Sequence, residues 1–298
     1  MQHREFIRSL KPEQRRDLTT TINAPATLRI VILICFFIGF TTGILADAPG
    51  QLIWMTLQGL CIVSLFHLLH ECVHDTVFVP RWANRLLAFV CGFVLFLPSI
   101  WFRHFHFAHH RYTQQPGKDP ELDAAKPETR RGWLLHVSGI PVWLSQWRLL
   151  VRSVVKPSNE PYIPESDRQS VRLEMWLMLL GYSLLFVVSV TMQSWMLVYV
   201  WLVPAILGQP FLRLYLLAEH AGCESGSSNM FFNTRTVLSN PVLRWFTWNM
   251  PFHTEHHVYP TVPFHQLPRL HQMMKAHVAT LEPGYVVFNV DFFRLMNR

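Results

Sequence analysis

The stretch LIWMTLQGLCIVSLFHLLHECVHD, residues 52–75, passes from an uncharged apolar run directly into a group of histidines. The run 52–69 is long enough to enter or cross the hydrocarbon core of a membrane as a helix. His70 and His74 follow at i and i+4, so both point to one side of a helix, and with Glu71 they match the HExxH pattern of zinc proteases. The same pair would serve zinc, iron or manganese. The rest of the chain must therefore identify the metal and the reaction.

The composition is that of a membrane protein. Half of the 298 residues are hydrophobic and 15% are charged, against about a quarter in soluble domains. The net charge is +7, which in a soluble protein can indicate a nucleic acid partner. Here Lys and Arg are absent from 30–80 and from 173–212, so the positive charges lie in the segments outside the apolar runs and no nucleic acid partner is expected. The five cysteines have no paired spacing, which argues against disulfides and zinc ribbons.

Four apolar runs, 30–46, 52–69, 173–191 and 195–212, form two pairs, each with a short polar joint. They predict an all-α integral membrane protein with four transmembrane helices in two hairpins. Neither hairpin turn carries positive charge, so we expect both termini and the loop 70–172 to lie in the cytoplasm. The membrane is expected to be the inner (cytoplasmic) membrane. Residues 1–29 are expected to form a cytoplasmic N-terminal segment, and residues 30–298 one membrane-embedded domain.

Two further segments have amphipathic or interrupted patterns. The run 86–102 is uncharged, but Gly92 and Pro98 interrupt it, so we expect an element that dips into the membrane and returns to the same side. Residues 133–155 mix tryptophans with arginines, which predicts one amphipathic helix on the inner leaflet.

The sixteen histidines are clustered, and two clusters repeat the spacing HxxHH. Residues at i, i+3 and i+4 project from one side of a helix, so each box is expected to present two or three imidazoles to one point. His67 and His104 lie beside boxes but outside the repeated pattern, and their role stays open. The candidate metal ligands are His70, His74, His106, His109, His110, His220, His253, His256 and His257.

Nine histidines exceed the needs of one metal. A catalytic zinc uses three protein ligands, so a protease would leave six of them without a role, whereas two metals with four or five nitrogens each would use them all. A metal transporter would carry its ligands along the bilayer midplane, and these lie at the ends of spans and in loops. The acidic residues beside the boxes are expected to orient imidazoles from behind, or to be exposed charges at helix ends: Glu71, Asp75, Glu219 and Glu255.

The boxes HECVHD, HFAHHRYTQQPGKDPEL and NMPFHTEHHVYPTVP resemble those of the membrane-bound fatty acid desaturase and hydroxylase superfamily, from the second apolar run to about Pro268. The resemblance implies a bundle of four transmembrane helices with a helical cytoplasmic cap that holds two irons through the nine histidines. One position departs from the acyl-CoA desaturases, which place Asn four residues before the isolated histidine. Here that residue is Leu216, and the chain looks closer to bacterial desaturases and hydroxylases.

The resemblance implies oxidation of an unactivated C–H bond with O2 as co-substrate. Desaturation of a fatty acyl chain of a lipid is the first expectation. Hydroxylation of a lipid, a carotenoid or a smaller alkyl substrate is the alternative, because the outcome depends on substrate position, which no sequence pattern reports. The chain has neither a dinucleotide fingerprint nor an iron-sulfur cysteine cluster, so electrons are expected from a separate ferredoxin or cytochrome-type protein.

Overall fold

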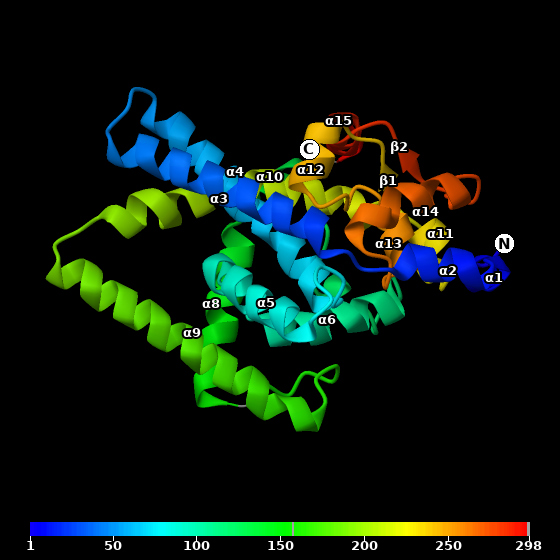
Figure 1. Ribbon diagram of the computed structural model, residues 1–298, viewed down its shortest axis with the longest axis horizontal. Helices are drawn as coiled ribbons and strands as arrows, with labels where there is room; N and C mark the ends of the chain where they lie inside the picture. Colours follow the sequence, from blue (N-terminus) through cyan, green and yellow to red (C-terminus); the bar gives the residue numbers. More distant parts are fainter. Residues whose placement is uncertain (157, 297–298) are drawn as a thin grey trace.

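The computed structural model describes residues 1–156 and 158–296, and within them the chain is mostly helical (Figure 1). The elements are α1 (His3–Ser9), α2 (Pro12–Thr19), α3 (Asn23–Leu45), α4 (Gln51–Val73), α5 (Arg81–Leu95), α6 (Ser99–Tyr112), the 3-10 helix η1 (Pro120–Asp123), α7 (Arg130–Val137), α8 (Ile140–Val155), α9 (Glu165–Thr191), the π-helix η2 (Val198–Leu202), α10 (Val203–His220), α11 (Met230–Asn233), β1 (Thr236–Val237), α12 (Pro241–Phe246), α13 (His253–Val258), the 3-10 helix η3 (Phe264–Gln266), α14 (Leu267–Met274), β2 (Leu281–Glu282) and α15 (Tyr285–Leu295).

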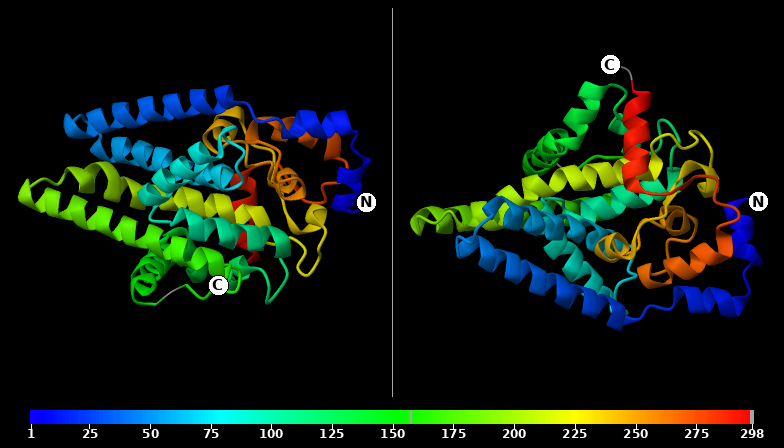
Figure 2. Two further views of the ribbon diagram at one scale, coloured as in Figure 1. Left: turned by 60° about the horizontal axis from the view of Figure 1, so that its bottom comes forward. Right: turned by 90° about the horizontal axis from the view of Figure 1, so that it is seen from above.

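Four helical segments are long and apolar enough to cross a membrane, as the sequence predicts. They are Pro12–Leu45, Gln51–Val73, Glu165–Thr191 and Val198–His220, with mean hydropathies of 2.3, 1.9, 1.9 and 1.5. The segments pair as two hairpins whose turns lie at the same end of the molecule, on the left in Figures 1 and 2. A 23-residue helix is about 34 Å long, which exceeds the hydrocarbon core of a bilayer. The helices therefore continue past the apolar runs at the opposite end, where the histidines lie.

The two hairpins meet where α4 crosses α10. Small residues stand at this contact: a Cβ atom added to Gly208 would lie 2.5 Å from the carbonyl oxygen of Gly59 and 2.8 Å from Cγ1 of Val63. Such close approach of two backbones is typical of helix pairs in membranes, where van der Waals packing replaces the hydrophobic effect as the driving force. This contact sets the distance between the helices that carry His70 and His220.

Gly208→Val should destabilise the folded protein strongly. The valine side chain must separate α4 from α10, and overpacking of this kind costs about 3 kcal/mol. Gly39→Val, the same change where an added Cβ meets nothing within 4 Å, is the matched control. Thermal unfolding in detergent checks the prediction. Equal melting temperatures for the two variants would contradict the role given to this contact.

The helices α5 and α6 form a bent pair with an angle of 99° between them. The break falls at Phe96, whose φ of 59° lies in the left-handed region, and at Pro98, which caps α6. Helix α5 starts shortly after the end of α4 in the chain. Helix α6 comes back to the end of α4, because the ring centroids of His106 and His70 are 4.3 Å apart. The pair therefore enters and leaves at the same end of the bundle, as expected for a dipping element.

The segment 133–155 differs from the prediction. It belongs to two helices, α7 and α8, instead of one, and the chain turns between them at Ser138 and Gly139. Gly139 has a φ of 72°, a conformation that glycine adopts at little cost, and its Cα packs against the side chain of Gln209. The prediction of a single helix is wrong because it followed the tryptophan and arginine pattern and gave no weight to this glycine.

The C-terminal part folds over the ends of α4, α6 and α10. A short parallel pair, β1 and β2, matches Thr236 with Leu281 and holds the chain on either side of α13 and α14. The N-terminal helix α1 packs on the same region, where Asn229 accepts a hydrogen bond from the His3 backbone N–H at 3.2 Å. Residues 1–29 thus contact the part of the chain that carries α13, at the right of Figure 1.

Candidate metal centre

The nine candidate histidines come from four helices that converge at one end of the bundle. The last turn of α4 and the residue after it supply two, α6 supplies three, the last residue of α10 supplies one and α13 supplies three. Seven of the nine are buried, and the other two are partly buried. Side chains separated by almost two hundred residues in the sequence therefore meet in one place.

The histidines form two groups, in each of which one nitrogen per ring lies within 4.8 Å of all the others. In the first group, Nε2 of His106 lies 2.9 Å from Nε2 of His74 and 2.9 Å from Nε2 of His110. In the second group, Nε2 of His220 lies 3.2 Å from Nε2 of His109 and 2.9 Å from Nε2 of His253. The first group consists of His70, His74, His106, His110 and His256, and the second of His109, His220, His253 and His257.

Each HxxHH box is divided between the two groups. His106 and His110 of α6 belong to the first group, whereas His109 belongs to the second. Helix geometry explains this division, because residues at i and i+4 differ by about 40° around the axis while i+3 lies about 60° to the other side. In α13 the roles are exchanged: His253 and His257 at i and i+4 enter the second group, and the residue at i+3 enters the first. Two imidazoles of each box therefore face one point, as the spacing predicts, and the third faces the other group.

The donor set fits two metal ions. Buried imidazole nitrogens that point at one another about 3 Å apart repel unless a proton or a cation lies between them. Burial lowers the pKa of His74 to about 3, and burial with neighbouring imidazoles holds the pKa values of His256 and His257 well below their usual range. These rings are therefore neutral near pH 7, the form that binds a metal. Nε2 of His257 has no hydrogen-bond partner among the described residues, which leaves it available to an ion.

The rings of the second group are held from behind. Asp119 accepts a hydrogen bond from Nδ1–H of His109 at 3.0 Å, and the carbonyl oxygen of Asn233 accepts one from Nδ1–H of His220 at 3.0 Å. The two hydrogen bonds fix the tautomers of His109 and His220 and direct Nε2 of each ring inward. An Oε1 of Glu219 lies 3.3 Å from Nδ1 of His253, although that nitrogen makes no well-formed hydrogen bond.

Three of the four acidic residues expected behind the rings have other partners. The carboxylate of Glu71 accepts hydrogen bonds from the Thr76 hydroxyl at 2.9 Å and from the Phe264 backbone N–H at 3.0 Å. Neighbours in a helix point about 100° apart, so a carboxylate adjacent to a ligand in sequence faces elsewhere. Asp75 pairs with Arg103 at 3.2 Å, and Glu255 with His271 at 2.6 Å and with Thr236 at 2.7 Å. Glu219 is the one of the four whose carboxylate lies near a candidate ligand, His253.

Two acidic residues at the second group were not among the expected site residues, although Asp119 and Pro120 after the second box also resemble the pattern of the desaturase superfamily. Asp119 is fully buried and caps η1, and a detectable signal was present: an Asp directly before Pro is typical of the start of a helix. An Oε2 of Glu121 lies 3.3 Å from Nε2 of His109, the nitrogen that faces the group. No local pattern distinguishes this glutamate from the exposed acids nearby, so only the fold reveals it.

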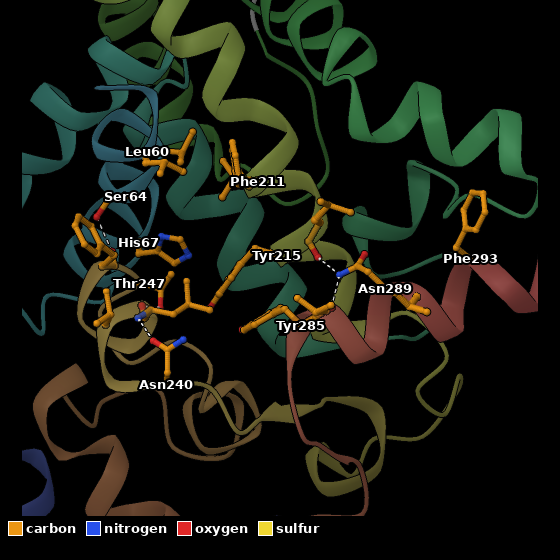
Figure 3. Close-up of a pocket in the computed structure, with 18 of the residues that line it drawn as sticks. Leu60, Ser64, His67, Phe211, Tyr215, Asn240, Thr247, Tyr285, Asn289 and Phe293 are labelled. Carbon is orange, nitrogen blue, oxygen red and sulfur yellow. Dashed lines mark hydrogen bonds between the residues drawn. The ribbon is translucent and has the colours of Figure 1, made fainter. Parts of the chain in front are cut away.

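His67 and His104, whose role the sequence leaves open, lie outside both groups. His104 pairs with Asp167 at 3.0 Å. His67 precedes His70 by one helical turn and lies on the wall of a cavity of about 1180 Å³ between α4, α10, α12 and α15 (Figure 3). This wall is mostly apolar and includes Leu60, Phe211 and Phe246. A pocket of this size and lining can enclose an extended hydrocarbon chain beside the first group.

Comparison with known proteins agrees with this geometry. A sequence profile described as "Fatty acid desaturase" matches residues 46–289. The sphingolipid delta(4)-desaturase DES1 of Xenopus tropicalis is 29% identical over 230 residues, which cover 74% of this chain and 65% of that protein. The sphingolipid delta(4)-desaturase/C4-monooxygenase DES2 of Rattus norvegicus is 28% identical, with 73% and 64% covered. The delta(8)-fatty-acid desaturase of Euglena gracilis is 22% identical, with 71% and 57% covered.

The chain spans less than two thirds of the length of these relatives. The profile match, by contrast, extends from the first hairpin turn into the C-terminal helix and includes all nine histidines of the two groups. The chain therefore belongs to the fatty acid desaturase family.

Proposed function

We propose that this protein is a membrane-bound di-iron oxidoreductase that uses O2 to desaturate the hydrocarbon chain of a lipid. The observation that carries the proposal is the gathering of nine histidines into two adjacent groups of five and four. The relatives named above act on sphingolipids or fatty acids, which supports a lipid substrate. The overall reaction takes two hydrogens from neighbouring carbons and consumes O2, two electrons and two protons, giving an alkene and two molecules of water.

The residues of the two groups would hold one iron each, and Glu121 offers an oxygen donor beside the second. Bound iron would supply the oxidising power that attacks an unactivated C–H bond. Asp119 and the carbonyl oxygen of Asn233 keep the rings of His109 and His220 in position. Burial of the groups excludes bulk water, which protects a strong oxidant from side reactions.

A zinc protease is disfavoured by the same residues. The HExxH pair His70 and His74 shares its group with three further histidines, so the group is not the three-ligand site of such an enzyme. The carboxylate of Glu71, which would be the general base, accepts hydrogen bonds from Thr76 and from the backbone of Phe264. The pattern at residues 70–74 therefore serves the dimetal arrangement.

We further propose that both termini and the centre face the cytoplasm. The hairpin turns, at the end of the bundle opposite the histidines, lack Lys and Arg, in agreement with the positive-inside rule. Electrons would come from a separate ferredoxin or cytochrome-type protein, since the sequence has no cofactor motif of its own for their delivery.

The test combines metal analysis of the detergent-purified protein with mass spectrometry of lipids from cells that express it. We expect about two irons per chain and lipids two mass units lighter than those of control cells. His109→Ala should abolish the product, whereas His265→Ala, a change outside both groups, should not. Lipids sixteen units heavier would assign a hydroxylase instead. A single zinc with unchanged lipids would refute the proposal.

A further inference from the structure

A groove of about 520 Å³ opens between α5, α6 and α9, where the bent pair meets the second hairpin. Each of these helices contributes residues from one stripe of its surface, and the end of α4 closes the groove from behind. No described residue is common to this α5–α9 groove and to the cavity between α4, α10, α12 and α15. The groove is therefore a separate feature of the molecule.

The α5–α9 groove is polar at its mouth and apolar farther in. Helices α5 and α9 both start at the histidine end of the bundle and run into the membrane. Arg85 of α5 precedes Phe89 by one turn, and both line the groove. Ser170 of α9 likewise precedes Leu173 and Leu177, whose exposures of 59% and 48% show that they face outward. A membrane lipid has the same order, with a polar head above hydrocarbon chains.

The groove ends where α5 and α9 touch. A Cβ atom added to Gly181 would lie 2.6 Å from the ring of Phe93, and the Tyr182 hydroxyl donates to the carbonyl oxygen of Phe93 at 2.8 Å. This contact lies one turn beyond the last groove residue of α5. The groove can thus hold the head and the upper chain segments of a lipid, while the rest of the chains continues along the exposed Leu180 and Leu184 of α9.

The carboxylates that face the groove already have partners, whereas one arginine has none. Asp167 lies 3.0 Å from Nε2 of His104. Glu174 is buried and accepts the two backbone N–H groups at the start of α6, at 2.9 and 2.8 Å. Arg85 is exposed and forms no ion pair within residues 1–156 and 158–296. The charge that remains uncompensated at the mouth is therefore positive.

Arg103 is the second cation of the wall, and its side chain is 35% exposed. Its guanidinium group donates to the carbonyl oxygen of Val73 and pairs with Asp75 at 3.2 Å. A guanidinium group has five N–H donors, so further donors remain for an anion, and phosphate is an anion that arginine recognises well. Val73 and Asp75 flank His74 of the first group, so this arginine connects the groove with the end of α4.

We infer that the α5–α9 groove binds an anionic phospholipid of the surrounding membrane. Arg85 and Arg103 bind its phosphate, and the upper part of its chains packs against Phe89, Leu173 and Leu177. The bound lipid is a ligand of the fold and not the substrate, because the groove is separate from the cavity beside the histidines. The inference goes beyond the proposed function and does not depend on it.

The test measures equilibrium binding of two lipids to the detergent-purified full chain by native mass spectrometry. The lipids are dioleoylphosphatidylglycerol, which is anionic, and dioleoylphosphatidylcholine, which has the same chains and no net charge. One basic residue near a membrane surface changes binding of an anionic lipid about 5-fold, so the wild type should prefer phosphatidylglycerol roughly 5- to 25-fold. Arg85→Gln should lower this preference about 5-fold.

Arg81→Gln is the matched control, because Arg81 lies one turn earlier on α5, is exposed and does not line the groove. It removes the same charge and should leave the preference unchanged. Leu177→Trp fills the apolar part of the groove and should weaken binding of both lipids. The melting temperature of each variant, measured without added lipid, shows whether the fold is intact.

Equal binding of the two lipids by the wild type would overturn the inference. An equal loss of preference in Arg85→Gln and Arg81→Gln would do so as well, because the effect would then come from net charge and not from the groove. Displacement of phosphatidylglycerol by inorganic phosphate would show a site for a free anion and would also count against it. Absence of any oxidised lipid in cells, with the preference for phosphatidylglycerol intact, would refute only the proposed function.

Discussion

His253→Ala and His256→Ala should each lower the metal content from about two irons per chain to about one, and both should reduce lipid desaturation at least about 100-fold. The two residues lie three positions apart on the short helix α13, yet they enter different groups. Each substitution therefore removes one ligand from one site while the other site keeps its full set. Activity is lost in both variants because the proposed reaction needs both metals.

Metal analysis and Mössbauer spectroscopy of iron-57-loaded protein check this prediction. The two variants should retain different single-site spectra, and the spectrum of the wild type should be close to their sum. His265→Ala again serves as the control outside the groups. Loss of both irons in each variant, or retention of both in each, would contradict the division of the histidines into two sites.

Asp119→Asn should weaken metal binding at the second group by about 10- to 100-fold, the usual effect of losing a residue that orients a ligand. Asp119 is buried, and its two oxygens lie 3.0 and 3.1 Å from Nδ1 of His109. The same carboxylate accepts the backbone N–H groups of Gln114 at 2.8 Å and Glu121 at 3.0 Å. An asparagine fills the same space but removes the negative charge that supports His109 as a metal ligand.

A cobalt(II) titration of the metal-free protein, followed by visible absorption, measures the two binding events separately. The weaker event in Asp119→Asn should be the one that is also lost in His253→Ala. Asp123→Asn, an exposed position in the same 3-10 helix η1, should bind as the wild type does. Equal weakening of both events would indicate general destabilisation instead of a role at His109.

The transmembrane helices were predictable because their constraint is local. Backbone groups in hydrocarbon must be satisfied within the helix itself, so an apolar run of sufficient length is nearly enough to identify a span. The run 52–69 lies within α4, and the run 30–46 extends past α3 by one residue. The ends were less predictable: α4 continues to Val73 and α10 to His220, since polar residues beyond the membrane extend a helix as readily as apolar ones.

The partners of the histidines were only partly predictable. His70 and His74 share a group because i and i+4 fall on one stripe of a helix, which is a local property. The hydrogen-bond partner of His109 is ten residues away, across a turn at Gln114 with a φ of 58°, and no periodicity reports such a contact. The adjacent carboxylate of Glu71, which looked like the natural partner of His70, turns instead to the backbone of Phe264.

The sequence by itself determined the membrane class, the two hairpins and the nine histidines, because hydrophobic length, charge placement and residue chemistry are properties of single segments. Only the tertiary structure decided which histidines share a group, which carboxylates support them and where the cavity lies. The reason is geometric: the cavity wall combines residues of α4, α7, α10, α12 and α15, which lie far apart in the chain. Contacts between such segments depend on how helices cross, here at Gly59 and Gly208, and not on any pattern within one of them.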